Sequence, residues 1–199
     1  QNIIWVGSPS GGLWKSEDGG SNWTTNTDNL PVIGVSSIVI HPVNPQIMYI
    51  VTGDAFGSDT YSIGVLKSID GGQNWQTTGL SYNISQENRI NKIILNPNFP
   101  DSIFAATNSN IKISVDGGAN WTNVTSQNGL SMMGRWRDLE FKPNDPSTIY
   151  AAKQISSGGS SIFRSEDGGI TWAVTNNGMN SPAKDRPLLA VTNDNPNVV

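Results

Sequence analysis

The sequence predicts an all-β protein built of repeated units with short strands, and three observations support this fold class. An eight-residue pattern, S-x-D-G-G-x-x-W, occurs at Ser16, Ser68, Ser114 and Ser165. Its copies stand roughly 50 residues apart, which is the size of a supersecondary repeat. The 21 Gly and 11 Pro indicate many turns, and no segment shows the apolar periodicity of an amphipathic helix.

Each repeat is expected to contain four strands, named A to D in chain order. In the second repeat they are SSIVIHP, IMYIVT, GVLKS and NWQTT. A Pro-rich turn joins A to B, a variable loop joins B to C, and the eight-residue pattern joins C to D. Four short strands in a period of about 50 residues favour a blade of a β-propeller over a solenoid or a sandwich.

We expect a single propeller region over residues 1–199. Its repeats are 35–89, 90–135 and 136–185, with partial repeats at 1–34 and 186–199. The sequence starts at a strand B and stops after a strand A. Because both ends fall inside a repeat, we expect a segment of a larger propeller. The alternative is a four-bladed ring in which residues 187–191 pair beside residues 3–6.

The eight-residue pattern, called the box from here on, has a structural explanation. Its two glycines can adopt positive φ in a tight C-to-D hairpin. Its Asp can accept backbone N–H groups of the turn, and its Trp can bury a large ring against the hairpin. The box residues assigned this role are Ser16, Asp18, Gly20, Trp23, Ser68, Asp70, Gly72, Trp75, Ser114, Asp116, Gly118, Trp121, Ser165, Asp167, Gly169 and Trp172.

S-x-D-G-G-x-x-W at this spacing resembles the Asp-box, or bacterial neuraminidase repeat (BNR). The resemblance implies a β-propeller and leaves function open, because the family includes sialidases, sortilin-type receptors, xyloglucan-degrading endoglucanases and photosystem II assembly factors. The segment TGDAFGSDTYSIGVLKSIDGG and the Asn-rich, Cys-free composition resemble secreted or cell-surface proteins of Bacteroidetes-type bacteria, of the sortilin-like or glycosyl-hydrolase-like repeat kind.

Composition excludes several function classes. The net charge is -4, and the 12 Lys and Arg form no cluster longer than residues 135–137, so nucleic acid is not an expected partner. The absence of Cys and the single His41 argue against thiolate, zinc or His-based catalysis. We expect no metal and no cofactor. No apolar run reaches the ~20 residues of a membrane span, and no signal peptide is visible.

A functional site is expected on the B-to-C and D-to-A loops, which lie at the opposite end of the blades from the boxes. In the loop GDAFGSDTYSIG, Asp54 and Asp59 are candidates for the acid and base of a glycosidase or for cation ligands. The simpler explanation, which we prefer, is that both are turn-forming residues among glycines. Asp54 stands near where xyloglucan-degrading relatives place a catalytic Asp, and Tyr61 is a candidate ligand contact.

The loop GLSMMGRWRD offers Met132 and Met133 and a cluster of Arg135, Trp136 and Arg137. An Arg beside a Trp could stack on a sugar ring or hold a carboxylate. Arg89, Arg137 and Arg186 each stand near the start of a strand A, where they could line a propeller channel. The arginines do not match the pattern of a sialidase.

The function favoured by these features is a non-catalytic binding or adhesion propeller, part of a secreted or cell-surface bacterial protein that recognises a protein or a glycan. One alternative is a glycoside hydrolase of the xyloglucan-degrading type. Another is a sortilin-like or assembly-factor propeller that captures a peptide. The enzyme question stays open, with the binding role preferred.

Overall fold

The structure is a computed structural model that describes residues 2–55, 57, 60–125, 134–155, 159–177 and 186–199. The chain divides into two compact units, Gln1–Asn91 and Lys92–Val199. Each unit has its own hydrophobic core.

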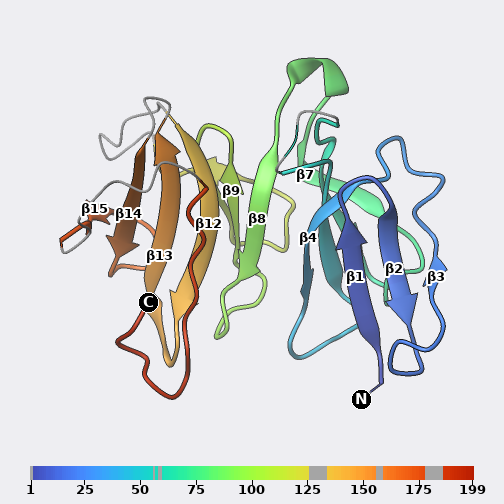
Figure 1. Cartoon of the computed structure of the whole chain (residues 1–199), viewed down its shortest axis with the longest axis horizontal. Helices are drawn as coiled ribbons and strands as arrows, with labels where there is room; N and C mark the ends of the chain where they lie inside the picture. Colours follow the sequence, from blue (N-terminus) through green and yellow to red (C-terminus); the bar gives the residue numbers. More distant parts are fainter. Residues whose placement is uncertain (1, 56, 58–59, 126–133, 156–158, 178–185) are drawn as a thin grey trace. The chain divides into compact units, whose positions relative to one another are not determined.

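Unit 1 contains one three-stranded and one four-stranded sheet (Figure 1). The first sheet is β1 (Ile4–Ser8), β2 (Gly12–Ser16) and β3 (Thr24–Thr25). The second is β4 (Val35–Ile40), β5 (Met48–Thr52), β6 (Gly64–Ser68) and β7 (Gln76–Ser81), followed by the 3-10 helix η1 (Ile84–Gln86).

Unit 2 contains two four-stranded sheets. One is β8 (Ile90–Leu95), whose first two residues belong to unit 1, β9 (Ile103–Thr107), β10 (Ile111–Ser114) and β11 (Thr122–Asn123). The other is β12 (Arg135–Lys142), β13 (Asp145–Ile155), β14 (Gly159–Ser165) and β15 (Ala173–Val174).

The strands of every sheet are hydrogen-bonded in chain order, as in a blade. The pairs β4–β5, β5–β6 and β6–β7 run antiparallel, and so do β12–β13, β13–β14 and β14–β15. The predicted fold class, an all-β protein with four-stranded antiparallel blades, is therefore confirmed. The part of the chain that the structure describes contains no helix with the length and hydropathy of a membrane span.

Strands B of the second and third repeats lie in the core because they are covered on both faces. All five residues of β5 and all five of β9 are buried, which explains why MYIVT and IFAAT are continuous apolar runs rather than alternating ones. The outer strands are short and exposed, as in β15, where both residues are exposed.

Two expected strand positions differ from the structure. Strand D of the second repeat begins at Gln76 rather than at residue 74, because the last residues of the box still belong to the turn. Residues 187–191 form no strand. Instead, the backbone N–H of Leu189 donates to Asp138 Oδ2 at 2.9 Å.

Candidate functional site

The boxes use their polar groups within their own hairpins. In each box the Ser Oγ accepts the N–H of the second glycine at 2.8–2.9 Å and donates to the Asp at 2.7–2.9 Å. The Asp also accepts the backbone N–H four residues later. Both glycines of every box have positive φ, as predicted.

These hydrogen bonds lower the pKa of the box carboxylates. The side chain and the backbone of Asn22 lower the pKa of Asp18 to about 2. Asp70 and Asp116 have the same pKa of about 2, with the backbone N–H of the Asn four residues later as the largest cause. Such acids stay ionised and bound to the turn, so they are not available as proton donors.

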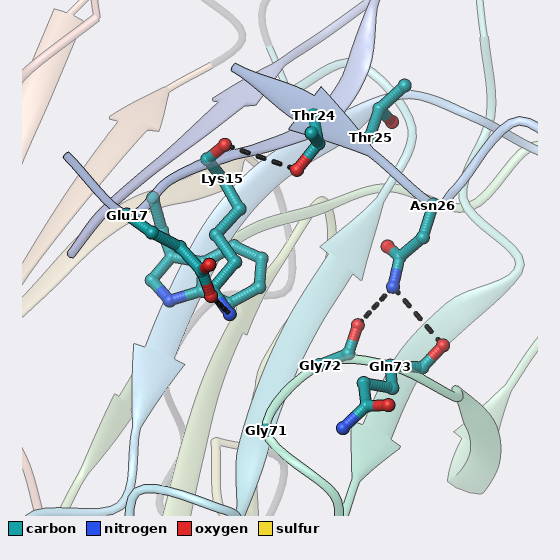
Figure 2. A pocket seen from close by; sticks show the side chains of 9 residues that line it. Lys15, Glu17, Thr24, Thr25, Asn26, Gly71, Gly72 and Gln73 are labelled. Carbon is teal, nitrogen blue, oxygen red and sulfur yellow. Dashed lines mark hydrogen bonds and ion pairs between the residues drawn. The ribbon is translucent and has the colours of Figure 1, made fainter. Parts of the chain in front are cut away.

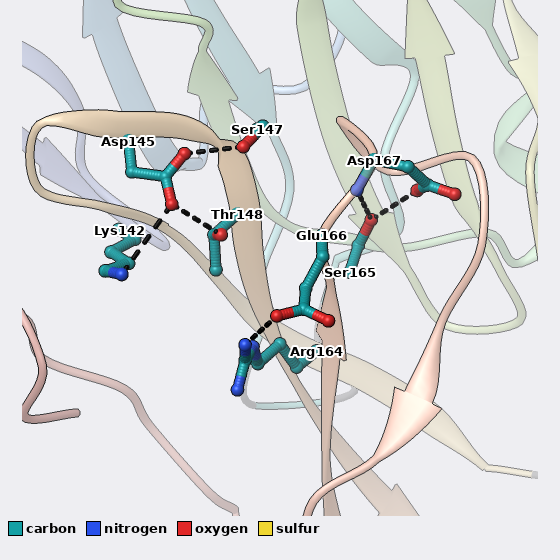
Figure 3. A network of polar contacts seen from close by, with 8 residues as sticks. All are labelled: Lys142, Asp145, Ser147, Thr148, Arg164, Ser165, Glu166 and Asp167. Atoms are coloured by element: carbon teal, nitrogen blue, oxygen red, sulfur yellow. Dashed lines mark hydrogen bonds and ion pairs between the residues drawn. The ribbon is translucent and has the colours of Figure 1, made fainter.

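In the second, third and fourth boxes, the first glycine links the hairpin to the A-to-B turn of the same sheet. Gly71 N–H donates to Gln46 O at 2.9 Å, and Gly168 N–H donates to Ser147 O at 2.8 Å. Figure 3 shows this end of the fourth repeat, where Asp145 accepts from Ser147 and Thr148 and Arg164 pairs with Glu166. We call the end of each blade that carries the turns and boxes the box end, and the opposite end the loop end.

The second glycine of a box also receives an aromatic ring from the preceding sheet. A Cβ at Gly72 would lie 2.7 Å from the Trp5 ring, and one at Gly169 would lie 2.6 Å from the Phe104 ring.

The box tryptophans differ in burial: Trp172 is 8% exposed and Trp23 is 38% exposed. Trp75 and Trp121 are half-buried. The Trp23 ring still donates to Gly20 O of its own hairpin, so the box Trp contacts its turn in the first box without being buried there.

A polar pocket of about 200 Å³ lies in unit 1 between β3 and the second box (Figure 2). Asn26 donates its side-chain N–H groups to the carbonyls of Gly72 and Gln73. Lys15 pairs with Glu17 and stands 5.3 Å from the Trp5 ring centre. The pocket's polar groups thus join the first and second sheets, and sequence reasoning did not identify it because its residues come from two repeats.

At the loop end of unit 1, hydrogen bonds fix the segment between β5 and β6. Asp54 N–H donates to Thr60 O at 3.1 Å, and Ser62 N–H donates to Asn88 O at 2.9 Å. Thr52 Oγ1 lies 3.2 Å from Ser62 Oγ inside this loop. The loop is therefore tied both to its own strand and to the segment that precedes β8.

This arrangement brings together two predicted site residues, Tyr61 and Arg89. The Arg89 guanidinium carbon lies 4.7 Å from the centre of the Tyr61 ring. Arg89 is only 9% exposed, whereas Tyr61 is half-buried. Arg89 Nε is buried, and so is Oγ1 of Thr60, the residue before Tyr61; within the described residues neither atom has a hydrogen-bond partner.

Of the two candidate acids in this loop, the structure describes Asp54. Its Oδ2 accepts the backbone N–H of Gly57 at 2.7 Å, which is the contact of a turn-forming Asp. Asp59 lies outside the described residues. Within the described part of the chain, no group of three or more His, Cys, Asp or Glu side chains is placed to hold a metal ion.

The three residues of the cluster at 135–137 differ in burial: Trp136 and Arg137 are buried, and Arg135 is exposed. Trp136 is 0% exposed and packs 4.9 Å from Phe163 and 6.5 Å from Trp172, measured between ring centres. The expectation that Trp136 stacks on a ligand is contradicted, because its position on β12 turns the ring into the core of unit 2. Met132 and Met133 lie outside the described residues.

The arginines of unit 2 also differ from one another. Arg137 is 6% exposed and donates from Nε and one terminal nitrogen to Gln154 Oε1, at 2.8 and 2.6 Å. It sits at a bulge between Trp136 and Asp138. Arg135 and Arg186 are exposed. Arg137 is thus held by an amide of its own unit, and the other two present their side chains to solvent.

Sequence reasoning missed a charged cluster on the strands A of unit 2. Lys92 Nζ lies 3.3 Å from Asp138 and 3.1 Å from Glu140. Burial opposes the charge of Lys92, but the two carboxylates outweigh it and raise its pKa. The alternation of Asp138 and Glu140, two residues apart and hence on one face of β12, is the signal that could have suggested a shared partner.

Comparison with solved structures agrees with this fold. The chain is similar to an ancestral GH74 enzyme, with TM-score 0.75 and 19% identity, over 92% of this chain and 25% of that one. It is also similar to the GH74 xyloglucanase from Xanthomonas campestris (TM-score 0.66, 17% identity, 89% and 29%). A third similar structure is YCF48 bound to D1 peptide (TM-score 0.60, 20% identity, 92% and 54%).

No family model and no curated protein matches the sequence. At these identities, the structural similarity shows the fold alone. The class of protein is thus a β-propeller, of which this chain has the four-stranded antiparallel sheets. The chain spans about a quarter of the first two solved proteins and about half of the third.

Proposed function

We propose that the chain is part of a non-catalytic binding propeller that recognises its ligand at the loop end. The observation that carries this proposal is the Tyr61–Arg89 pair, in which a cationic side chain lies 4.7 Å beneath an aromatic ring. Loops on a rigid sheet commonly carry binding residues. The box end supports the same assignment, because its acids are engaged in turn hydrogen bonds.

The wider setting of this function follows from the comparisons and the sequence. We propose that the boxes are Asp-boxes, supported by their spacing and their shared hydrogen bonds. The chain then belongs to a larger secreted or cell-surface bacterial protein, of the sortilin-like or glycosyl-hydrolase-like repeat kind seen in Bacteroidetes. Its partial coverage of the similar propellers and the extracellular domain among them support this setting.

A binding array tests the proposal directly. The chain would be presented to plant and host glycans and to extracellular proteins, with Tyr61→Ala as the test variant and Val43→Ala as the control. Val43 is 82% exposed in an A-to-B turn at the box end, so its loss leaves the loop end unchanged. Saturable binding that Tyr61→Ala weakens supports the proposal, and equal effects of the two substitutions would contradict it.

A glycoside hydrolase is the second candidate, favoured by the similarity to the GH74 xyloglucanase. Asp54, directly after β5, is then one member of the carboxylate pair. Asp54→Asn keeps an oxygen that can accept the Gly57 N–H, so the loop should persist while catalysis falls. Xyloglucan cleavage by the chain or its parent, lowered by at least about 100-fold in this variant, would establish the hydrolase instead.

Peptide capture is a third candidate, suggested by the similarity to YCF48 bound to D1 peptide. A sortilin-like or assembly-factor propeller would retain a defined extended peptide rather than a sugar. Recovery of one peptide sequence from a random peptide library, with no glycan bound on the array, would support this alternative.

A further inference from the structure

We propose that the loop end of unit 1 binds the carboxylate of an acidic sugar, a uronic acid, through the guanidinium of Arg89. This inference rests on the proposed binding function and adds the chemical class of the ligand. It is carried by the buried Arg89 Nε, whose guanidinium lies against the Tyr61 ring, and by the buried hydroxyl of Thr60, the residue before Tyr61. Neither atom has a hydrogen-bond partner among the described residues.

The environment of Arg89 is unusual for a charged group. Buried charges in proteins are normally paired, because removing an ion from water without a counter-charge is costly. The Tyr61 ring attracts the guanidinium, but an aromatic face replaces only part of the lost hydration. Within the described part of the chain, Arg89 belongs to none of the ion pairs.

Of the acids in these two segments, the structure describes Asp54 and Glu87, and Asp59 lies outside the described residues. Asp54 uses Oδ2 to accept the Gly57 N–H. Glu87 is exposed and caps η1 with a left-handed backbone. An anion from outside the described residues therefore fits the unmet requirement of the guanidinium.

A carboxylate matches the donors that are available. Arginine presents a planar fork that binds the two oxygens of a carboxylate side by side. Thr60 adds a hydroxyl that can both donate and accept, and it adjoins Tyr61 in the segment that Ser62 N–H ties to Asn88 O. A sugar acid has a carboxylate next to ring hydroxyls, so it could engage Arg89 and Thr60 together.

The backbone at this place favours a sugar over a peptide. An extended peptide is usually captured by pairing with a free strand edge. Residues 60–63 belong to no strand. The Thr60 carbonyl and the Ser62 N–H already have backbone partners. A sugar acid needs only side-chain donors and an aromatic ring, and both are present.

The test follows the Nε–Hε cross-peaks of the arginines by ¹⁵N–¹H NMR on the whole chain. Each cross-peak is assigned by an Arg→Lys substitution. The chain is titrated with galacturonate and, in parallel, with galactose, which has the same stereochemistry and no carboxylate. We expect a saturable shift of the Arg89 cross-peak with galacturonate and none with galactose. Arg164, which pairs with Glu166 near the box end, should not move.

Two variants sharpen this test. Arg89→Lys keeps the charge and removes the fork, and should weaken galacturonate binding at least tenfold. Thr60→Val removes the hydroxyl at similar volume, and should weaken binding several-fold. If Arg89→Lys fails to fold, the Arg→Lys substitutions at the other four arginines assign the Arg89 cross-peak by elimination, and the titration of the unsubstituted chain still decides the proposal.

Several results would overturn it. One is an Arg89 cross-peak that stays fixed at saturating galacturonate or moves equally with galactose. A second is a stronger response to N-acetylglycine, which carries the carboxylate of a peptide terminus. A third is a shifted Arg89 cross-peak in unliganded Asp59→Asn, which would identify a carboxylate of the chain itself as the partner. Binding of another ligand at the loop end with Arg89 unmoved would remove this inference and leave the proposed function standing.

Discussion

Substitution of the second glycine of a box should destabilise the protein more than substitution of the first. Gly168 and Gly169 form a matched pair in the fourth box, with φ of 72° and 90°. An alanine at either position takes a left-handed backbone, which costs about 1–2 kcal/mol. Either alanine also recovers about 0.4–1 kcal/mol, because it restricts the unfolded chain. These terms are shared, so they cancel in the comparison.

The difference between the two alanines comes from packing. A Cβ at Gly168 meets nothing within 4 Å, but one at Gly169 would lie 2.6 Å from Phe104 Cε1 and 3.3 Å from Ile149 Cδ1. Carbon atoms pack at about 3.5–4.0 Å, so the overlap with Phe104 approaches 1 Å. Phe104 is 1% exposed and stacks edge-on against Phe141, which leaves the ring little room. Overpacking of this kind costs about 1–3 kcal/mol.

Urea denaturation followed by circular dichroism measures both variants. We expect the free energy of unfolding of Gly169→Ala to fall about 1–3 kcal/mol below that of Gly168→Ala. Adding Phe104→Leu, which shortens the side chain, should make the effect of Gly169→Ala smaller in a double-mutant cycle. Equal destabilisation by the two alanines, or no coupling to Phe104, would refute the packing role of the second glycine.

Three further outcomes are expected. Acid titration should show stability held down to about pH 4 and lost as the pH falls toward 2, because the pKa of Asp18, Asp70 and Asp116 is lowered from 3.8 to about 2 in the folded chain. Asp70→Asn should make the loss of stability between pH 4 and pH 2 smaller. An unchanged loss would count against the contribution of the Asp70 carboxylate. Trp172→Ala should cost about 3–5 kcal/mol in urea unfolding, clearly more than Trp23→Ala, since Trp172 is 8% and Trp23 is 38% exposed; similar losses would disprove the difference. Trp136→Ala should cost a similar 3–5 kcal/mol and leave any loop-end affinity of the folded protein unchanged, whereas lost affinity without lost stability would restore Trp136 as a ligand contact.

The parts of the fold that could be predicted from sequence are those fixed by local chemistry. Glycines at positive φ, an Asp that accepts turn N–H groups and apolar runs such as MYIVT depend on a few adjacent residues, and the structure has them. Burial was less predictable, because it depends on which element covers a side chain. Trp136 looked like a binding residue between two arginines, but the strand turns it into the core.

The same reasoning explains why the sequence predicted candidate loops but could not distinguish among the arginines beside them. Arg89, Arg137 and Arg186 each stand near the start of a strand A segment, so the sequence alone does not distinguish them as candidate site residues. The structure separates them, since Arg89 lies against the Tyr61 ring, Arg137 is hydrogen-bonded to Gln154 and Arg186 is exposed. What distinguishes Arg89 is the preceding B-to-C loop, which is folded back by Asp54 N–H to Thr60 O and by Ser62 N–H to Asn88 O. The proposed function at the loop end thus depends on contacts between a variable loop and a repeated position, and such contacts form only when the blade is folded.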